Sequence, residues 1–176
     1  LKLLKKRKNI RIIDSSNLFN SQNLNYISNF NTLLFQSNDS LKFDKKNFIV
    51  VSKKKPTSIQ LKNLIFAFNV CRHVKSNAIV LTNNKSTVGI GSGQPSRLDS
   101  CNIAIEKMNK FCADKSKNLL AASDAFFPFV DGIEKLVQAG VSAVIQPSGS
   151  INDKKIVKFA NKTETILVFS KTRHFK

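Results

Sequence analysis

The fold class follows from residues 119–145, which read LLAASDAFFPFVDGIEKLVQAGVSAVI. Leu119–Ala122 is a short apolar run, which is typical of a buried strand. Gly132–Ala139 has apolar residues at helical spacing, Gly140 is suited to end that helix, and Val141–Ile145 is a second apolar run of strand length. This stretch therefore predicts a strand, a helix and a second strand in immediate succession.

The residues on both sides extend this pattern. Asp153–Ala160 predicts a further helix and Thr165–Phe169 a further strand. Because strands and helices alternate from Leu119 onward, we expect parallel pairing with right-handed crossovers, hence an α/β fold with a mixed sheet and helices on both faces. Upstream, the sequence predicts a loop over residues 14–25 and strands at 8–13, 32–36, 48–52, 77–82 and 87–91. The last two of these strands are expected to form a hairpin. It also predicts two helices, one from Thr57 or Ser58 to about Val74 and one from about Pro95 to Cys112.

Length and hydropathy bound the class of protein. A chain of 176 residues is one domain or part of a larger one, and it can bury a core. It begins with Leu1, which favours a fragment of a longer protein. No apolar run is long enough to cross a bilayer, and no apolar segment follows the basic N-terminus as in a signal peptide. We therefore expect a soluble, cytoplasmic protein with no membrane partner.

The net charge of +18 suggests a polyanionic partner, but the residue types that supply it do not. Five of the 29 basic residues are arginines, so lysine supplies 29 − 5 = 24. Nucleic-acid readers favour arginine for its bidentate fork. Asparagine, phenylalanine and isoleucine are also abundant and share A/T-rich codons with lysine, so a biased genome explains the charge more simply. We expect no nucleic-acid partner; the alternative is a basic nucleic-acid-binding α/β module, whose affinity would fall steeply with salt.

Cysteine and histidine spacings predict neither a disulfide framework nor a metal site. Cys71, Cys101 and Cys112 are odd in number and far apart, and each lies in a predicted helix as a small apolar residue. His73 and His174 are the only histidines in the sequence, and neither belongs to an H-x-E or H-x-x-x-H pattern. We therefore predict no metal cofactor.

The loop Ser123–Gly132 is the leading candidate for a ligand site. It joins a strand to a helix, where α/β proteins place ligands, and it holds three phenylalanines, a proline and two aspartates. Flat rings and a carboxylate near a helix N-terminus suit a planar heteroaromatic ligand. Two plainer interpretations compete: each ring taken alone more often fills the core, and Asp131 more often caps the helix that begins at Gly132.

The glycine-rich segment that follows the predicted hairpin is not a nucleotide motif. Gly89-x-Gly91-x-Gly93 has the wrong spacing for a dinucleotide fingerprint, and no Gly-Lys-Ser/Thr follows as in a P-loop. These glycines allow the backbone to approach a ligand or turn sharply. Arg97 lies in the first turn of the next helix, where a cation opposes the dipole unless an anion such as phosphate binds; a solvated arginine is an equal alternative. Asn77, at the entrance of a strand, is most simply a turn residue.

Taken together and in order, five motifs carry a family resemblance. They are KSNAIV at Lys75–Val80, GIGSGQPSR at Gly89–Arg97, the loop Ser123–Gly132, QPSGS at Gln146–Ser150 and RHF at Arg173–Phe175. This series resembles the C-terminal part of the bifunctional purine-biosynthesis family AICAR transformylase/IMP cyclohydrolase. The resemblance covers nearly the whole chain, because Leu33–Asp39 and Lys55–Thr57 are similar to the family's middle region. Five motifs in one order are specific, unlike any single glycine pattern.

The resemblance implies a function and an architecture. The function is formyl transfer from 10-formyltetrahydrofolate to the amine of aminoimidazole carboxamide ribonucleotide (AICAR), late in IMP and purine synthesis. The architecture is a cytidine-deaminase-like, three-layer α/β/α subdomain, with residues 1–56 as part of a middle region and residues 57–176 as the C-terminal transformylase subdomain. The family also implies a homodimer formed through the transformylase domain, with its sites at the interface.

Matching motif by motif, the resemblance assigns two groups of site residues. The nucleotide is expected to contact Asn77, Arg97, Phe126, Arg173 and Phe175. The folate is expected to contact Pro128, Phe129, Asp131, Gly149 and Ser150. An aromatic amine conjugated to a carboxamide is a weak nucleophile, so positioning and stabilisation of the oxyanion must supply much of the rate.

The chain departs from the family pattern in several places. The catalytic Lys-His cassette lies upstream of the matched region in the family and is absent here, as is the cyclohydrolase domain; His73 does not correspond to it. We therefore predict no catalytic residue in this chain and no turnover by it alone.

Val130 stands where arginine is common in the family, which weakens any charge contact there. Asn31-Thr32 replaces a glycine pair, which leaves that loop's conformation open, although asparagine tolerates left-handed geometry.

The implied fold suggests one further alternative, a zinc nucleobase deaminase. The H-x-E and P-C-x-x-C signatures of that class are both absent from the sequence. Stoichiometric zinc in the purified protein would favour this alternative.

Overall fold

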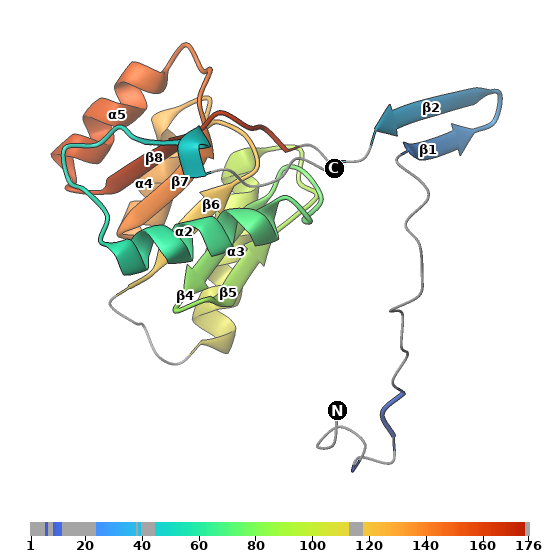
Figure 1. The fold of residues 1–176 in the computed structure, drawn as a ribbon, viewed down its shortest axis with the longest axis horizontal. Coiled ribbons are helices and arrows are strands. Elements are labelled where there is room, and N and C mark those ends of the chain that lie inside the picture. Colours follow the sequence, from blue (N-terminus) through green and yellow to red (C-terminus); the bar gives the residue numbers. More distant parts are fainter. Residues whose placement is uncertain are drawn as a thin grey trace. The chain divides into compact units, whose positions relative to one another are not determined.

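The computed structural model describes residues 6, 9–11, 24–37, 39, 45–112 and 118–174. The chain divides into two compact units, Leu1–Leu41 and Lys42–Lys176 (Figure 1). This division precedes residue 57, where we expect the family's C-terminal subdomain to begin. That subdomain boundary stays a prediction, because it concerns the organisation of the family rather than the compactness of this chain.

In the first unit, β1 (Leu24–Asn29) and β2 (Thr32–Ser37) form an antiparallel hairpin. The strand predicted at residues 32–36 is confirmed. The loop predicted over residues 14–25 is wrong at its last two residues, which belong to β1; residues 14–23 lie outside the described residues. Every residue of β1 is exposed, and its sequence, LNYISN, alternates apolar and polar residues only at its start, so the pattern of a half-buried strand is incomplete.

The turn of this hairpin is Phe30-Asn31. The sequence left the conformation of this loop open; in the structure Phe30 takes the left-handed conformation, with a φ of 44°. The hydroxyl of Thr32 donates to the carbonyl oxygen of Asn29 at 3.0 Å and closes the turn. Residues 8, 12 and 13 of the strand predicted at residues 8–13 lie outside the described residues; residues 9–11 are described and form no strand.

The second unit is built on one six-stranded mixed sheet in the order β3-β8-β7-β6-β4-β5 (Figure 1). Strands β6, β7 and β8 are parallel, as the alternation from Leu119 onward predicts. Strands β4 and β5 form the predicted hairpin, and β3 pairs antiparallel with β8. The strands are β3 (Phe48–Val50), β4 (Ile79–Asn83), β5 (Ser86–Gly91), β6 (Leu120–Ser123), β7 (Ala143–Pro147) and β8 (Ile166–Ser170).

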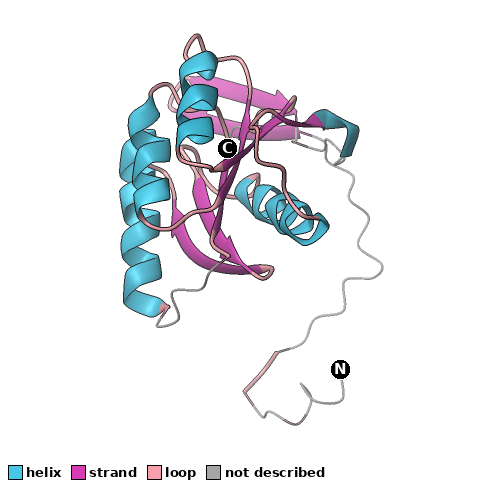
Figure 2. Ribbon diagram, turned by 90° about the vertical axis from the view of Figure 1, so that its left-hand side faces the viewer, coloured by secondary structure: helices cyan, strands magenta, loops and turns pink. Residues whose placement is uncertain are grey.

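Helices lie on both faces of this sheet, which confirms the predicted α/β class (Figure 2). They are α2 (Ser58–Cys71), α3 (Arg97–Phe111), α4 (Val130–Gln138) and α5 (Asp153–Lys162), with a short 3-10 turn, η1, at Lys45–Asn47. Successive strand residues point to opposite faces, so Ile79 and Leu81 pack in the core under α3, α4 and α5. Val80, between them, packs in the core under α2.

The helix ends follow local signals, with small shifts from the expected bounds. Thr57 caps α2 through a capping box: its hydroxyl accepts from the Gln60 N–H at 3.1 Å, and its own N–H donates to Gln60 Oε1 at 2.9 Å. Helix α4 begins at Val130 rather than at Gly132, so Asp131 lies inside its first turn and is not the cap. Among the described residues, no helix is both long enough and apolar enough to span a membrane.

Two glycines of β5 allow α3 to lie directly on that strand. A Cβ atom added at Gly89 would lie 2.1 Å from the carbonyl oxygen of Ala104, and one added at Gly91 would lie 1.9 Å from that of Ser100. Of the two uses expected for the glycine-rich segment, Gly89 and Gly91 allow a close approach by a helix, and Gly93, at φ 68°, allows a sharp turn. This contact fixes the N-terminus of α3, and with it Arg97, at one end of the sheet.

Candidate functional site

A pocket of about 450 Å³ lies at the end of the sheet where β6 ends and α3 and α4 begin. It is lined by Asn77, Pro95–Leu98, Ala125–Phe129, Asp131, Gly132 and Arg173. Four sequence-distant segments thus meet in one cavity: the segment before β4, the N-terminus of α3, the phenylalanine loop and the segment after β8. Of the ten predicted site residues, seven line this pocket: Asn77, Arg97, Phe126, Pro128, Phe129, Asp131 and Arg173.

The interpretation of Arg97 as a solvated arginine is wrong, because its side chain is buried and paired within the protein. Its side chain is 7% exposed, and its Nη1 lies 2.5 Å from Oδ1 of Asp124, which is 1% exposed. Nη1 also donates to the hydroxyl of Ser123 at 2.9 Å, and Nη2 donates to Oδ1 of Asn77 at 2.8 Å. The negative charge that stabilises a cation at the N-terminus of α3 is therefore the carboxylate of Asp124.

Asn77 connects Arg97 to the glycine-rich segment. Its Nδ2 donates to the carbonyl oxygens of Gln94 and Pro95, both at 2.9 Å, while its Oδ1 accepts from Arg97. Its backbone carbonyl accepts from the hydroxyl of Ser100 at 2.8 Å. The turn residue inferred from sequence is therefore a polar link between β4, the segment before α3 and α3 itself.

Asp124 and Ser123 organise this network, and neither was singled out from the sequence. The available signal was a carboxylate placed directly after a buried strand, where a charge requires a partner. The Ser123 hydroxyl accepts from Arg97 and donates to the carbonyl oxygen of Ala125 at 2.6 Å, which shapes the start of the phenylalanine loop.

The three phenylalanines of the loop have three different environments. Phe127 is 1% exposed and packs in the core, as the plainer interpretation holds for any single ring. Phe126 is half-buried at the pocket, and the guanidinium carbon of Arg173 lies 5.0 Å from its ring centroid, a cation–π geometry. Phe129 is 63% exposed. The loop therefore anchors one ring in the core and leaves two at the site.

A short polar chain joins the phenylalanine loop to the loop after β7. Nδ2 of Asn152 donates to the carbonyl oxygen of Pro128 at 2.7 Å. The N–H of Asn152 donates to the hydroxyl of Ser150 at 3.1 Å, and the N–H of Gly149, at φ 116°, donates to Oδ2 of Asp153 at 2.8 Å. Gly149 and Ser150 do not line the pocket, but Asn152 brings their loop to its rim.

The segment after β8 docks against the same end of the sheet. The N–H of His174 donates to the carbonyl oxygen of Asp124 at 3.1 Å, and its ring centroid lies 4.9 Å from that of Phe68. This contact places Arg173 over Phe126. Phe175, the remaining predicted nucleotide contact, lies outside the described residues.

Asp131 does not cap a helix, but it does stabilise one. Its Oδ1 accepts from the N–H of Gly132 at 2.7 Å within the first turn of α4, where a negative charge is favourable. Since it also lines the pocket, the same carboxylate is available to a ligand.

The buried thiols are not nucleophiles. Burial raises the pKa of the Cys71 thiol well above its usual value and that of the Cys101 thiol to about 12, so both are protonated near neutral pH. The Cys71 thiol points at the carbonyl oxygens of Ala78 and Ala122. Among the described residues, no three His, Cys, Asp or Glu side chains gather as a metal site.

A larger cavity of about 780 Å³ lies at the opposite end of the sheet, between α3 and α4. It contains none of the predicted site residues; its lining includes Asn83, Glu106, Cys112 and Lys135. The smaller pocket is the stronger candidate because ionic, aromatic and amide groups from distant segments converge there.

Comparison with known proteins identifies the family. A sequence profile of the AICARFT/IMPCHase bienzyme family matches residues 1–107. The chain is 41% identical over 177 residues to the bifunctional purine biosynthesis protein PurH of Buchnera aphidicola subsp. Schizaphis graminum, an alignment that covers 100% of this chain and 34% of that protein. For the PurH protein of Listeria monocytogenes serovar 1/2a, the identity is 41% over 174 residues, with 99% and 33% covered.

The PurH protein of Nostoc sp. PCC 7120 is 38% identical over 174 residues, with 99% of this chain and 34% of that protein covered. The chain thus spans about a third of the length of these relatives. Among solved structures, the apo dCMP deaminase of cyanophage S-TIM5 aligns with a TM-score of 0.42 and 16% identity, covering 64% of this chain and 98% of that one. With a family profile over residues 1–107 and relatives 38–41% identical across the chain, this protein belongs to the AICARFT/IMPCHase bienzyme family.

Proposed function

We propose that this chain is the C-terminal part of an AICAR transformylase, which transfers a formyl group from 10-formyltetrahydrofolate to the amine of AICAR. The observation that carries the proposal is the pocket at the end of the sheet, which is lined by Phe126, Arg173 and Arg97. An aromatic face, a cation beside it and fixed hydrogen-bond donors suit a planar, anionic nucleotide. We include in the proposal the cytidine-deaminase-like subdomain fold, the cytoplasmic location and the homodimer that the family implies.

The nucleotide half of the site contains two arginines with different roles. Because the Asp124 carboxylate compensates the charge of Arg97, the guanidinium of Arg97 offers directed N–H groups to a ligand rather than net charge. A guanidinium carries five N–H groups, and described partners accept from three of them. We assign these groups to a neutral oxygen of the nucleotide, such as that of its carboxamide. Arg173, over the ring of Phe126, supplies positive charge to the phosphate.

The folate half is the exposed side of the phenylalanine loop. Pro128 and Phe129 present apolar surface to a flat heterocycle, and Asp131 offers a carboxylate that accepts from its N–H groups. Gly149 and Ser150 approach the same rim through Asn152. This arrangement brings a formyl donor to one side of the pocket and the acceptor amine to the other.

The chain's part in the reaction is to hold the two substrates in place. The acceptor is a weak nucleophile, so fixing its amine against the formyl carbon removes much of the entropic barrier. Proton transfer and oxyanion stabilisation require further groups, which in the family belong to the Lys-His cassette upstream of the matched region. We therefore expect this chain to bind substrates without turning them over.

Calorimetric titration of the 176-residue chain with AICAR tests the nucleotide half of the site. We expect Phe126→Leu to weaken AICAR binding about tenfold, because the stacking face is lost. Phe111→Leu is the matched control, since Phe111 is exposed at the end of α3. No AICAR binding by the wild-type chain, or equal losses in the two variants, would contradict the proposed site. Formyl transfer by the chain alone would contradict its dependence on the upstream cassette.

A further inference from the structure

A row of aromatic rings leads from the edge of the sheet to the segment after β8. Phe48, in the edge strand β3, meets Phe68, in α2, nearly at a right angle, with ring centroids 6.1 Å apart. The ring of Phe68 meets the imidazole of His174 at 4.9 Å. Phe68 is 1% exposed and His174 is 3% exposed, so both rings pack in the interior. We call these three side chains the aromatic row.

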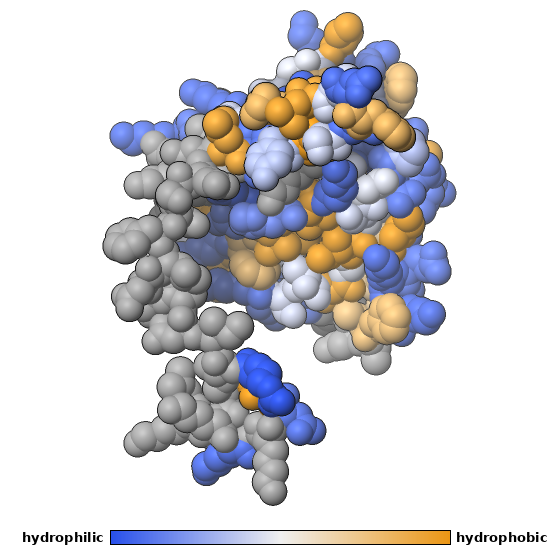
Figure 3. Space-filling view, turned by 90° about the vertical axis from the view of Figure 1, so that its right-hand side faces the viewer, coloured by the Kyte–Doolittle hydropathy of each residue, from blue (hydrophilic) through white to orange (hydrophobic). Residues whose placement is uncertain are grey.

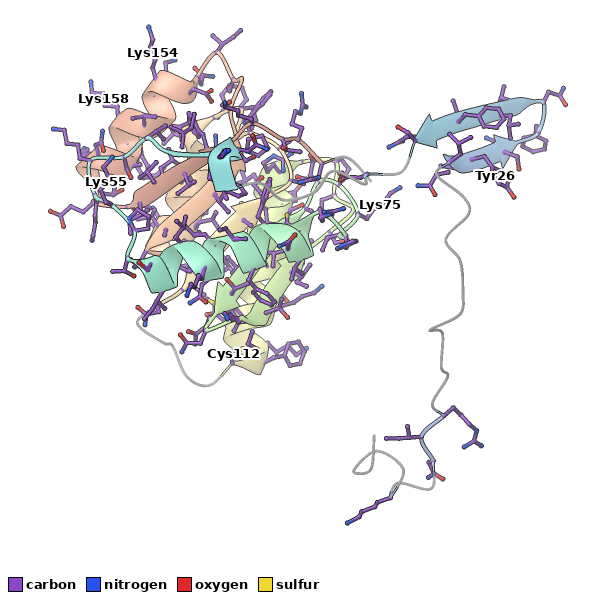
Figure 4. All side chains as sticks on the ribbon, in the orientation of Figure 1. Tyr26, Lys55, Lys75, Cys112, Lys154 and Lys158 are labelled. Carbon is purple, nitrogen blue, oxygen red and sulfur yellow. The ribbon has the colours of Figure 1, made fainter. Side chains whose placement is uncertain are left out.

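The aromatic row lies at the end of the sheet that holds the pocket. Phe68 is in the last turn of α2, which runs toward that end. Figure 4 shows Lys75, which follows α2, at that end of the second unit, and Cys112, which lines the larger cavity, at the other. The row therefore reaches the neighbour of Arg173, which lines the pocket, although its own three residues do not.

Hydrogen bonds hold the backbone on both sides of Arg173. Before it, the N–H of Lys171 donates to the carbonyl oxygen of Asn47 at 3.1 Å. After it, the N–H of His174 donates to the carbonyl oxygen of Asp124 at 3.1 Å. The aromatic row adds a third anchor, since it holds the ring of His174 against α2. Arg173 thus projects toward the pocket from a backbone that is tied to three different elements.

Arg173 depends on such anchors because burial does not hold it. The residue is exposed, and its guanidinium carbon lies 5.0 Å from the ring centroid of Phe126. An arginine side chain has many rotamers, and ordering it when a ligand binds lowers the affinity. A backbone that is already fixed brings the guanidinium to the ring before the ligand arrives.

We propose that Phe68 and His174 are positioning residues for AICAR: they fix the backbone of Arg173 so that its guanidinium stays over Phe126, where the phosphate binds. This inference rests on the proposed function, because it requires AICAR in the pocket. Neither Phe68 nor His174 lines the pocket, so both act through Arg173.

Ordinary core packing is the competing explanation for the aromatic row. Phe68 belongs to the core cluster between α2 and the sheet, and its truncation destabilises that cluster whatever happens at the site. A smaller folded fraction would weaken AICAR binding by the same factor with or without Arg173. A positioning role makes the effect of Phe68 depend on Arg173, and a double-mutant cycle measures that dependence.

The test is calorimetric titration with AICAR of the wild-type 176-residue chain, F68L, R173Q and F68L/R173Q. The matched control uses L64A in place of F68L in the same cycle, because Leu64 lies one turn earlier in α2, is completely buried and belongs to the same core cluster. Urea unfolding checks that each variant is folded under the conditions of the titration. H174L, which removes the other ring of the contact, takes the place of F68L if that variant does not fold.

We expect F68L to weaken AICAR binding about fivefold when Arg173 is present and by less than about twofold in the R173Q background. L64A should change the affinity by one and the same factor in both backgrounds. An equal loss from F68L in both backgrounds, or no loss in either, would overturn the inference and leave the proposed function standing. If the wild-type chain does not bind AICAR, the proposed function fails and the inference fails with it.

Discussion

Arg97 shows how a cation is accommodated where the helix dipole opposes it. It lies in the first turn of α3, and Asp124, from the end of β6, supplies the compensating charge. Both side chains are almost completely buried. Removing one of them therefore leaves an unpaired charge in the interior rather than a lost surface contact.

We expect Asp124→Asn to lower the free energy of unfolding by about 3 kcal/mol, because Arg97 would stay buried without its counter-charge. Urea unfolding monitored by circular dichroism measures the change. Glu106→Gln, on the exposed side of α3, is the matched control and should change stability by less than about 0.5 kcal/mol. If the two variants unfold alike, the ion pair does not stabilise the fold.

Cys101 gives the protein a predictable response to alkaline pH. Burial raises the pKa of its thiol from 9.0 to about 12, so the folded state holds this proton more tightly than the unfolded state. Its contribution to stability is complete below pH 9.0 and is lost progressively as the pH rises toward about 12. Cys101→Ala should therefore flatten the fall of unfolding free energy over that range relative to the wild type. Urea unfolding at a series of pH values measures this, and parallel curves for the variant and the wild type would refute the assignment.

At the scale of elements, the contact between α3 and β5 sets the position of the site. The carbonyl oxygens of α3 occupy the space that side chains at residues 89 and 91 would fill. Because backbone atoms cannot move aside as a flexible side chain does, the helix itself must shift if that space is taken. A shift of α3 would displace Arg97 from Asp124.

We expect Gly91→Ala to destabilise the protein by about 3 kcal/mol, since the new methyl group would lie 1.9 Å from the carbonyl oxygen of Ser100. Ser86→Ala, at an exposed position of the same strand, is the control and should be nearly neutral. Thermal unfolding of both variants tests this. A neutral Gly91→Ala would show that α3 does not rest on β5 as described.

Local signals predicted most elements of the second unit, and long-range contacts account for what the sequence did not reveal. Spacing alone predicts the parallel order from Leu119 onward and a helix start at Thr57 or Ser58, of which Thr57 is the cap. The pairing of Arg97 with Asp124 joins residues 27 positions apart, and no local pattern specifies it. Nor does the sequence tell which of the loop's three phenylalanines enters the core, because that depends on how the loop meets α4.

At the scale of the whole molecule, the two units differ in how they bury apolar surface. Both core clusters belong to the second unit. The hairpin β1–β2 exposes its large apolar side chains instead, among them Tyr26, Phe30 and Phe35. Hydrophobic groups stand at the surface beside hydrophilic ones on the face drawn in Figure 3.

We expect a chain of residues 42–176 to fold cooperatively without residues 1–41, with an unfolding free energy within about 1 kcal/mol of the full chain's. The reason is that its sheet, its helices and both of its core clusters are internal to the second unit. Matched urea titrations of the two chains measure the difference. Loss of a cooperative transition in the shorter chain would show that the second unit depends on the first.

The glycines under α3 also affect how relatives of this protein should be compared. Gly89 and Gly91 belong to a motif that borders the proposed substrate pocket, yet the space they leave open is filled by the protein's own helix. Selection would retain them in any descendant that keeps this helix on this strand, including one whose pocket has lost or exchanged its substrate. Their presence in a distant homologue therefore indicates the same packing of helix on strand. Whether that homologue keeps the activity has to be judged from the side chains that face the pocket.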